Sequence, residues 1–221
     1  MKRRLSNQRT GGLTLVEVLV AIAAVVVLAG ILLPMLANSK ARSNRIGCVS
    51  NLKGIGLAFR MFSGDHGEKF PWAVSITNDG TLEFSRTADV FRHFLAISNE
   101  LSSPKVLHCE KDTKRTKTSS WDQLTNNTHL SYFVGLDSSE STPQTILSGD
   151  RNLTTNGRAA RGVISIATNV VLGFTREMHQ TGANIALGDG SAQQVTAGAF
   201  QKQHTAQILG GSREPVRLAI P

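Results

Sequence analysis

Cysteine is scarce in this chain of 221 residues, which has only Cys48 and Cys109. Two cysteines exclude both a disulfide-dense scaffold and a zinc site built from cysteine alone. The two could form one disulfide if the domain lies outside the cytoplasm. Cys48 also fits an apolar helix stripe, and free cysteine is often buried in such stripes. The sequence leaves these two alternatives open.

Common catalytic motifs are missing as well. The chain has no Gly-x-Ser-x-Gly, and Ser191 follows a turn glycine in GDGS, which does not resemble a nucleophile elbow. GDRNL, at residues 149–153, lacks the spacing of a phosphate loop. Asp65, His66 and Glu68 match no standard metal-ligand spacing and are typical of a solvated helix end. We therefore expect no enzymatic activity.

Acidic residues are absent before the first long apolar run, where four basic residues occur: Lys2, Arg3, Arg4 and Arg9. The chain has 24 Lys and Arg against 16 Asp and Glu, a net charge of +8, and without these four it would carry 20 − 16 = +4. Half of the positive excess thus lies in the first twelve residues. This distribution indicates a leader segment and only weakly supports nucleic-acid binding.

The apolar run, Leu13 to Ala37, has 25 residues and one charge. It is too long for the apolar core of a secretory signal peptide and long enough to cross a bilayer as a helix. Four basic residues precede it, and Lys40, Arg42 and Arg45 follow it. The excess of positive charge on the N-terminal side is small and favours a cytoplasmic N-terminus.

The single charge in this run is Glu17. One interpretation places it in the first helical turns, near the interface, where the helix dipole favours an acid. The other is that it pairs with a cation inside an assembly, because acids within a membrane usually have a partner.

The segment GGLTLVE, residues 11–17, resembles the processing site of type IV prepilins and type II secretion pseudopilins. The resemblance implies that prepilin peptidase cuts between Gly12 and Leu13 and methylates the new amine of Leu13. It also implies that Glu17 pairs with the N-terminal amine of a neighbouring subunit. This pairing is physically reasonable, because a buried charge with a partner costs less than a buried charge alone. Many members have phenylalanine where this chain has Leu13.

The apolar pattern continues past the membrane segment as one face of a helix, at Cys48, Val49, Leu52, Ile55, Phe59 and Phe62. A helix from about Leu13 to Phe62 would have about 50 residues and a length of about 75 Å. We expect a leader at 1–12, a membrane half at 13–37, a continuation against the domain at 38–66, and a globular domain at 67–221. The segment SGDHG, residues 63–67, should end the helix.

The globular domain has strand-length apolar runs and little helix. AVSITNDGTLEF, residues 73–84, predicts a hairpin, and Thr87 to Leu101 predicts a helix packed on a sheet. Strands are expected in HLSYFVGL, TILSG, GVISI and NVVLGF. The predicted fold class is α+β and pilin-like, with one long N-terminal helix laid on an antiparallel sheet.

The C-terminal stretch HQTGANIALGDGSAQQV, residues 179–195, predicts a tight hairpin turn at Asp189-Gly190. Its His-x9-Asp-Gly spacing resembles a C-terminal signature of pilin-like proteins, formed here by His179, Asp189 and Gly190. Two roles remain for His179: a structural hydrogen bond to the hairpin, or a place with Asp189 in a metal or ligand site. For calcium, which needs several oxygen ligands, the candidates are Asp150, Asn184 and Asp189.

These features predict a filament subunit of a type IV pilus-like or type II secretion system, with no cofactor except calcium as a candidate. The expected partners are prepilin peptidase, other pilin or pseudopilin subunits, an inner-membrane assembly platform and lipid. The basic loop Glu110 to Trp121 could hold nucleic acid, but acids dilute it, so we do not expect this partner. The expected location is a single pass in the inner membrane, with the domain in the periplasm or on an extracellular filament. The alternative is a membrane-tethered periplasmic domain that binds a ligand or partner without polymerising.

Overall fold

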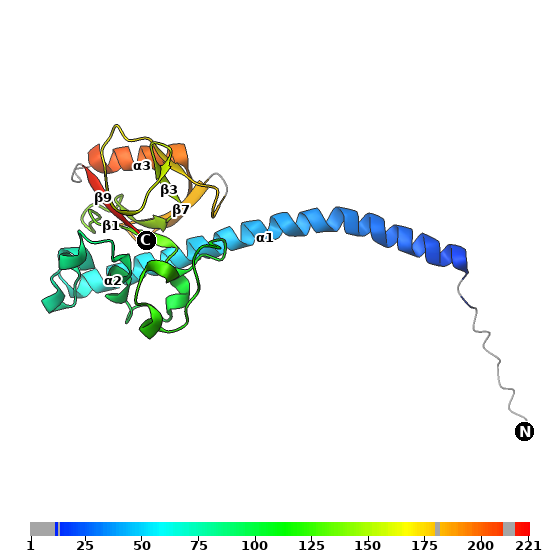
Figure 1. Ribbon diagram of the computed structural model, residues 1–221, viewed down its shortest axis with the longest axis horizontal. Helices are drawn as coiled ribbons and strands as arrows, with labels where there is room; N and C mark the ends of the chain where they lie inside the picture. Colours follow the sequence, from blue (N-terminus) through cyan, green and yellow to red (C-terminus); the bar gives the residue numbers. More distant parts are fainter. Residues whose placement is uncertain (1–11, 13, 180–181, 210–214) are drawn as a thin grey trace, which may run out of the picture. The chain divides into compact units, whose positions relative to one another are not determined.

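The computed structural model describes residues 12, 14–179, 182–209 and 215–221 and has an α+β fold with an antiparallel sheet (Figure 1). The chain divides into two units, Met1–Ser43 and Asn44–Pro221. Helix α1, Leu15–Asp65, contributes residues to both units. The predicted helix is thus present from Leu15 and ends in SGDHG as expected, while Leu13 lies outside the described residues.

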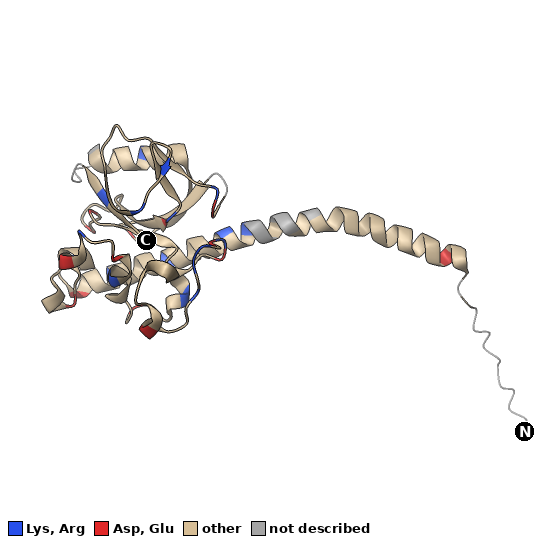
Figure 2. Cartoon of the chain, in the orientation of Figure 1, with Lys and Arg blue, Asp and Glu red and all other residues tan. Residues whose placement is uncertain are grey.

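The first unit contains the apolar part of α1. Among the described residues, one helix is long and apolar enough to cross a membrane, at Leu15–Leu33, with a mean hydropathy of 2.9. Its large apolar side chains are exposed within the chain, as at Leu15, Val25 and Leu33. Figure 2 shows this part of α1 without charge except for one acidic position near its start, which is Glu17.

In the second unit, five of the six residues of the predicted stripe on α1 are buried, and Val49 is half-buried. Cys48, Leu52, Ile55, Phe59 and Phe62 are each at most 2% exposed. Leu57 and Met61 lie on the other face of the helix and are exposed. The three- and four-residue spacing of the stripe therefore identified the face of α1 that packs on the domain.

The main sheet has six strands in the order β5-β9-β1-β2-β7-β8, and every neighbouring pair is antiparallel. Its strands are β1 Tyr132–Gly135, β2 Ile146–Asp150, β5 Gly162–Ile166, β7 Gly182–Leu187, β8 Ala192–Thr196 and β9 Val216–Ile220. A second, three-stranded sheet contains β3 Leu153–Thr155, β4 Arg158–Ala159 and β6 Leu172–Phe174. Helix α3, Ala197–Leu209, follows β8.

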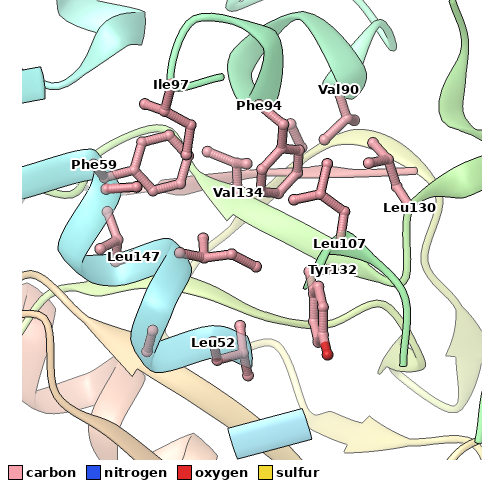
Figure 3. Close-up of a cluster of buried hydrophobic side chains, with 14 of the residues drawn as sticks. Leu52, Phe59, Val90, Phe94, Ile97, Leu107, Leu130, Tyr132, Val134 and Leu147 are labelled. Atoms are coloured by element: carbon pink, nitrogen blue, oxygen red, sulfur yellow. The ribbon is translucent and has the colours of Figure 1, made fainter. Parts of the chain in front are cut away.

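A hydrophobic core covers each face of the main sheet. Successive side chains of a strand point to opposite faces, so neighbouring residues of one strand join different cores. Tyr132 and Val134 of β1 join the α1 stripe and helix α2, Val90–Leu95, in one hydrophobic core (Figure 3). Phe133, between them, joins the second core with Phe200 of α3 and residues of the small sheet. The sheet is thus the middle layer between the α1 side and the α3 side (Figure 1).

The hairpin predicted at residues 73–84 is wrong. The segment forms two 3₁₀ turns, Ile76–Asn78 and Leu82–Phe84, after a first one at Pro71–Ala73. The carboxylate of Glu83 accepts bonds from Ser75 Oγ and Ile76 N, at 2.6 and 2.9 Å, and so joins the two turns. Gly80 lies so close to Val74 that a Cβ would be 2.0 Å from the Val74 carbonyl oxygen. These side-chain bonds replace the ladder of a hairpin.

The helix predicted from Thr87 to Leu101 is present only as α2, Val90–Leu95. Ser98 and Asn99 follow it, and such residues compete for backbone bonds in turns rather than helices. Phe94 and Leu101 are nevertheless buried as the pattern predicted. Further 3₁₀ turns are Pro104–Leu107, Trp121–Gln123 and Asn127–His129.

The four predicted strands are confirmed as β1, β2, β5 and β6. The Asp-Gly hairpin is confirmed between β7 and β8. Helix α3 and strand β9 were not predicted. The buried residues of α3, Phe200, His204 and Gln207, have the spacing of one helix face, but two of the three are polar, so the sequence carries a weak apolar pattern.

The core histidine His93 leads to a pH prediction. It is 0% exposed, its Nδ1 lies 2.7 Å from Thr81 Oγ1, and burial lowers its pKa to about 4. The unfolded chain takes up a proton at this residue below about pH 6.5, whereas the folded chain does not until about pH 4. Its contribution to stability is therefore lost as the pH falls through this window.

We expect the stability advantage of the wild type over His93→Gln to shrink by about 2 kcal/mol between pH 7 and pH 4.5. Guanidinium unfolding of the full chain in detergent, followed by tryptophan fluorescence, measures this difference. Trp72, which lies edge-on to His93, and Trp121 are the two tryptophans, so the signal reports on the second unit. A difference that stays constant with pH would contradict the prediction.

Candidate functional site

The start of α1 contains a reciprocal cap between Thr14 and Glu17. Thr14 N and Thr14 Oγ1 donate to Glu17 Oε2 at 2.7 and 2.8 Å, and Glu17 N donates to Thr14 Oγ1 at 3.3 Å. This is a capping box, in which two side chains satisfy backbone donors that the first helical turn leaves open. Gly12 is exposed, and a Cβ there would have no atom within 4 Å. Leu13 lies outside the described residues.

The Asp189-Gly190 turn docks on α1. Gly190 has a φ of 81°, which glycine adopts readily. A Cβ built on Gly56 of α1 would lie 3.3 Å from Gly190 Cα, and Arg60 Nη1 donates to Asp189 O at 2.8 Å. Asp189 Oδ1 accepts from Ser191 N at 2.8 Å. The Asp-Gly half of the signature therefore shapes the turn and lets it approach the helix.

The His179 half of the signature belongs to a buried polar cluster. Its Nε2 lies 3.3 Å from Cys109 Sγ and 3.5 Å from Asp150 Oδ2. Cys109 forms a disulfide with Cys48 of α1, which resolves the question that the sequence left open. The side chain of His179 thus contacts the disulfide and β2 rather than the hairpin turn, while its carbonyl accepts from Gly182 N at 3.2 Å.

Burial shifts both titratable groups of this cluster. It raises the pKa of Asp150 to about 8, against the bonds from Asn184 and the charge of Arg45. Burial also lowers the pKa of His179 to about 4, and the charges of Arg45 and Lys111 act in the same direction. At neutral pH the close contact between His179 and Asp150 is therefore one between neutral groups and not an ion pair.

The calcium candidates come together only in part. Asn184 N and Nδ2 both donate to Asp150 Oδ2, at 2.7 and 3.0 Å. Asp189 follows the other end of β7, and the three steps along the strand from Asn184 to Leu187 alone span about 10 Å. Calcium at these three residues stays a prediction from the sequence.

The basic loop 110–121 is partly neutralised. Lys117 bonds to Glu110, and Lys114 to Glu177. Arg151 binds both oxygens of Asp112, at 2.5 and 2.6 Å, beside a pocket of about 220 Å³ that Lys114 and Arg115 help to line. Two of these carboxylates, Glu110 and Asp112, belong to the loop itself, whereas Glu177 comes from a separate segment, which the composition of the loop does not reveal.

The helix end at residues 65–68 has the solvated character expected of it. His66 stacks on Phe62, with ring centroids 3.9 Å apart, and its Nδ1 lies 2.7 Å from Phe62 O. Glu68 has a φ of 61° and its N–H donates to Ser63 O. These contacts close the C-terminal turn of α1.

The cluster around His179 is the functional candidate that sequence reasoning missed. A Cβ on Gly182 would lie 2.5 Å from Arg45 Nη2, so glycine there leaves room for a guanidinium that lies three residues before Cys48 on α1. Cys48 and Cys109 are 61 residues apart, and His179 is a further 70 residues along the chain. No local spacing could have brought these residues together.

No family model, curated protein or solved structure matches this chain.

Proposed function

We propose that this chain is a structural subunit of a type IV pilus-like or type II secretion pseudopilus filament. Prepilin peptidase would cut the chain after Gly12. Helix α1, which Thr14 and Glu17 cap at its start, would then pack the subunit into the filament. The observation that carries the proposal is the acidic cap at the start of an exposed apolar helix, directly behind a basic leader and a glycine.

The exposed apolar face of α1 supports this function. Large side chains on several sides of the helix, such as Leu15, Val16 and Leu19, are more than half exposed within the chain. A surface of this extent requires a cover of lipid or of other apolar helices. Both covers are expected in turn, since the subunit would first lie in the inner membrane and then pack against neighbouring subunits.

The geometry of Glu17 supports a pairing role after cleavage. Within the part of the chain that the structure describes, the bonds that Glu17 accepts end on Oε2. Its other oxygen can therefore accept a bond from the amine of Leu13 in a second subunit. Cleavage creates that amine, and a paired carboxylate is tolerated in an apolar assembly where a lone one is not.

The expected product of processing is a chain that begins with N-methylated Leu13. Mass spectrometry of the wild-type protein, taken from membranes and from sheared filaments, checks this result. Gly12→Val is the matched variant: a side chain there meets no atom of the chain within 4 Å, so any block of cleavage must arise at the peptidase. An intact Met1 in the wild-type protein would overturn the proposal.

The location follows from the same proposal. The chain would pass once through the inner membrane, with its N-terminus in the cytoplasm and its globular unit in the periplasm or on the filament. Its partners would be prepilin peptidase, the assembly platform, lipid and other subunits. A tethered domain that never polymerises is the alternative outcome, in which methylated chain would be found in membranes and be absent from filaments.

A further inference from the structure

Four side chains that can bind metal meet beneath the second half of α1. Cys48 lies on α1, Cys109 follows the 3₁₀ turn Pro104–Leu107, Asp150 ends β2 and His179 precedes β7. Each of the four residues is at most 7% exposed. The two sulfur atoms and a ring nitrogen of His179 all lie within 4.8 Å of one another. The fold thus gathers two soft sulfur ligands, a borderline imidazole and a hard carboxylate from four separate segments.

The distances in this cluster suit a tetrahedral zinc site. With zinc–ligand bonds of 2.0 to 2.3 Å, ligand atoms lie about 3.3 to 3.8 Å apart. His179 Nε2 is 3.3 Å from Cys109 Sγ and 3.5 Å from Asp150 Oδ2. The two sulfur atoms are closer than this, because they are bonded to each other. Opening that bond would let them move apart to about 3.7 Å, the separation that zinc requires.

Asp150 points to a missing ligand independently of the cysteines. Its residue is 0% exposed, and its Oδ1 has no hydrogen-bond partner among the described residues. Asn184 holds the other oxygen through two donors. A buried carboxylate oxygen without a partner is costly, and a bound cation would satisfy it.

The segment that carries Cys109 is held beside α1 by more than the disulfide. Asn51 Nδ2, one turn after Cys48, donates to the carbonyl of His108 at 3.2 Å. Leu107 and Leu52 are both 0% exposed in the same core. These contacts keep the two cysteines close in a chain whose disulfide has not formed.

We propose that the reduced chain binds one Zn²⁺ through Cys48, Cys109, His179 and Asp150, and that the zinc site and the disulfide are alternative states of the same cluster. On binding, each thiol loses its proton and forms one Zn–S bond, Asp150 releases the proton that it carries at neutral pH, and His179 and Asp150 each donate a lone pair. The newly made chain carries both cysteines as thiols, so this state needs no reductant. Oxidation by a disulfide of an oxidant protein then forms the Cys48–Cys109 bond, reduces that disulfide to a dithiol with the two electrons and releases Zn²⁺. The inference does not depend on filament assembly.

The test uses the full chain in detergent, reduced with a phosphine, which takes up the disulfide's oxidising equivalents as phosphine oxide. After removal of the phosphine, Zn²⁺ is added, excess metal is removed, and metal content is measured by mass spectrometry. We expect about one zinc per reduced chain and none in the oxidised chain. Added Co²⁺ should give the absorption of a tetrahedral thiolate site.

Variants assign the ligands. Cys109→Ser and His179→Ala should lose the bound metal, whereas His129→Ala, at a half-buried histidine that contacts Thr116, should bind as the wild type does. Asn184→Ala keeps the four ligands and should weaken zinc binding about tenfold, because the Asn184 side chain that it removes orients Asp150. A reduced chain that unfolds but refolds on addition of Zn²⁺ would also support the site.

Several outcomes would overturn the inference. Zinc that is absent from the reduced chain, or present equally in the oxidised chain, excludes a site that competes with the disulfide. Zinc retained by Cys48→Ser/Cys109→Ser identifies an adventitious ion only. Zinc binding that leaves the rate of thiol oxidation unchanged shows that the metal lies elsewhere, because a metal on these thiolates must slow their oxidation.

Discussion

A chain with Glu17→Ala is expected to insert into the membrane and be cut after Gly12, but to be absent from filaments. The substitution leaves the amine of Leu13 in a neighbouring subunit without its carboxylate, in a surrounding of apolar helices. Removing one partner of a buried charge pair costs about 3–5 kcal/mol, which is a factor of more than about 100 for each subunit added. Pelleting of sheared filaments, with the membrane fraction measured beside it, checks this result.

Two further substitutions separate the pairing role of Glu17 from its role as a cap. Glu17→Gln can keep the cap, since glutamine also serves at this position of a capping box, but it carries no charge. Thr14→Ala removes the cap, at a cost of about 1 kcal/mol, and keeps the carboxylate. We expect filaments to be lost with Glu17→Gln and retained with Thr14→Ala. The reverse pattern would show that Glu17 serves the helix and not the assembly.

The parts of the fold that the sequence predicted are those with a long or regular pattern. The stripe from Cys48 to Phe62 repeats over four turns, and all of its residues except the half-buried Val49 are buried as expected. The strand runs are short, but β-branched and aromatic residues fill them, and Asp189-Gly190 marks the turn between β7 and β8. Regular burial on one face leaves a period in the sequence, and this period is what such reasoning detects.

The misjudged segments are those in which side chains decide the backbone. The alternation in residues 73–84 resembles two strands, yet hydrogen bonds that Glu83 accepts from Ser75 and Ile76 help to hold the segment in 3₁₀ turns. Helix α3 was missed because few of its positions are buried and the polar Gln207 is one of them, with its Oε1 accepting from Ile146 N at 3.0 Å. Such bonds cross from one element to another and have no local signature.

The same distinction applies to the candidate sites. The residues proposed for processing and assembly, Gly12, Leu13 and Glu17, lie within six positions of each other, so their spacing alone suggests them. The buried cluster joins Cys48, Cys109, Asp150 and His179 across the whole domain, and no pattern links them. The signature around His179 predicted that this region matters, but its contact with the disulfide needed the fold.

Loss of the disulfide is expected to be the most destabilising change in the globular unit. Cys48 and Cys109 are 61 residues apart, and closing a loop of this length in the unfolded chain is worth about 4 kcal/mol in the chain-entropy model. Both cysteines belong to the hydrophobic core, and each is at most 1% exposed. Cys48→Ala therefore removes the cross-link without placing a hydroxyl in the core, and it should lower the free energy of unfolding by about 4 kcal/mol.

Replacing either cysteine removes the whole cross-link, so replacing the second cysteine as well causes no further loss of this kind. Cys109→Ala and the double variant should both be destabilised about as much as Cys48→Ala, whereas packing losses at two sites would add. Guanidinium unfolding of the oxidised full chain, in detergent with a chelator present, measures the three values, and the chelator keeps zinc from masking the loss. Two single losses that sum to the loss of the double variant would mean that the cysteines act by packing alone.

Because the cross-link joins α1 to the segment before the sheet, its loss should also free the His179 ring from its sulfur contact. The disulfide is thus expected to stabilise the domain and to hold its two sulfur atoms beside the His179 ring.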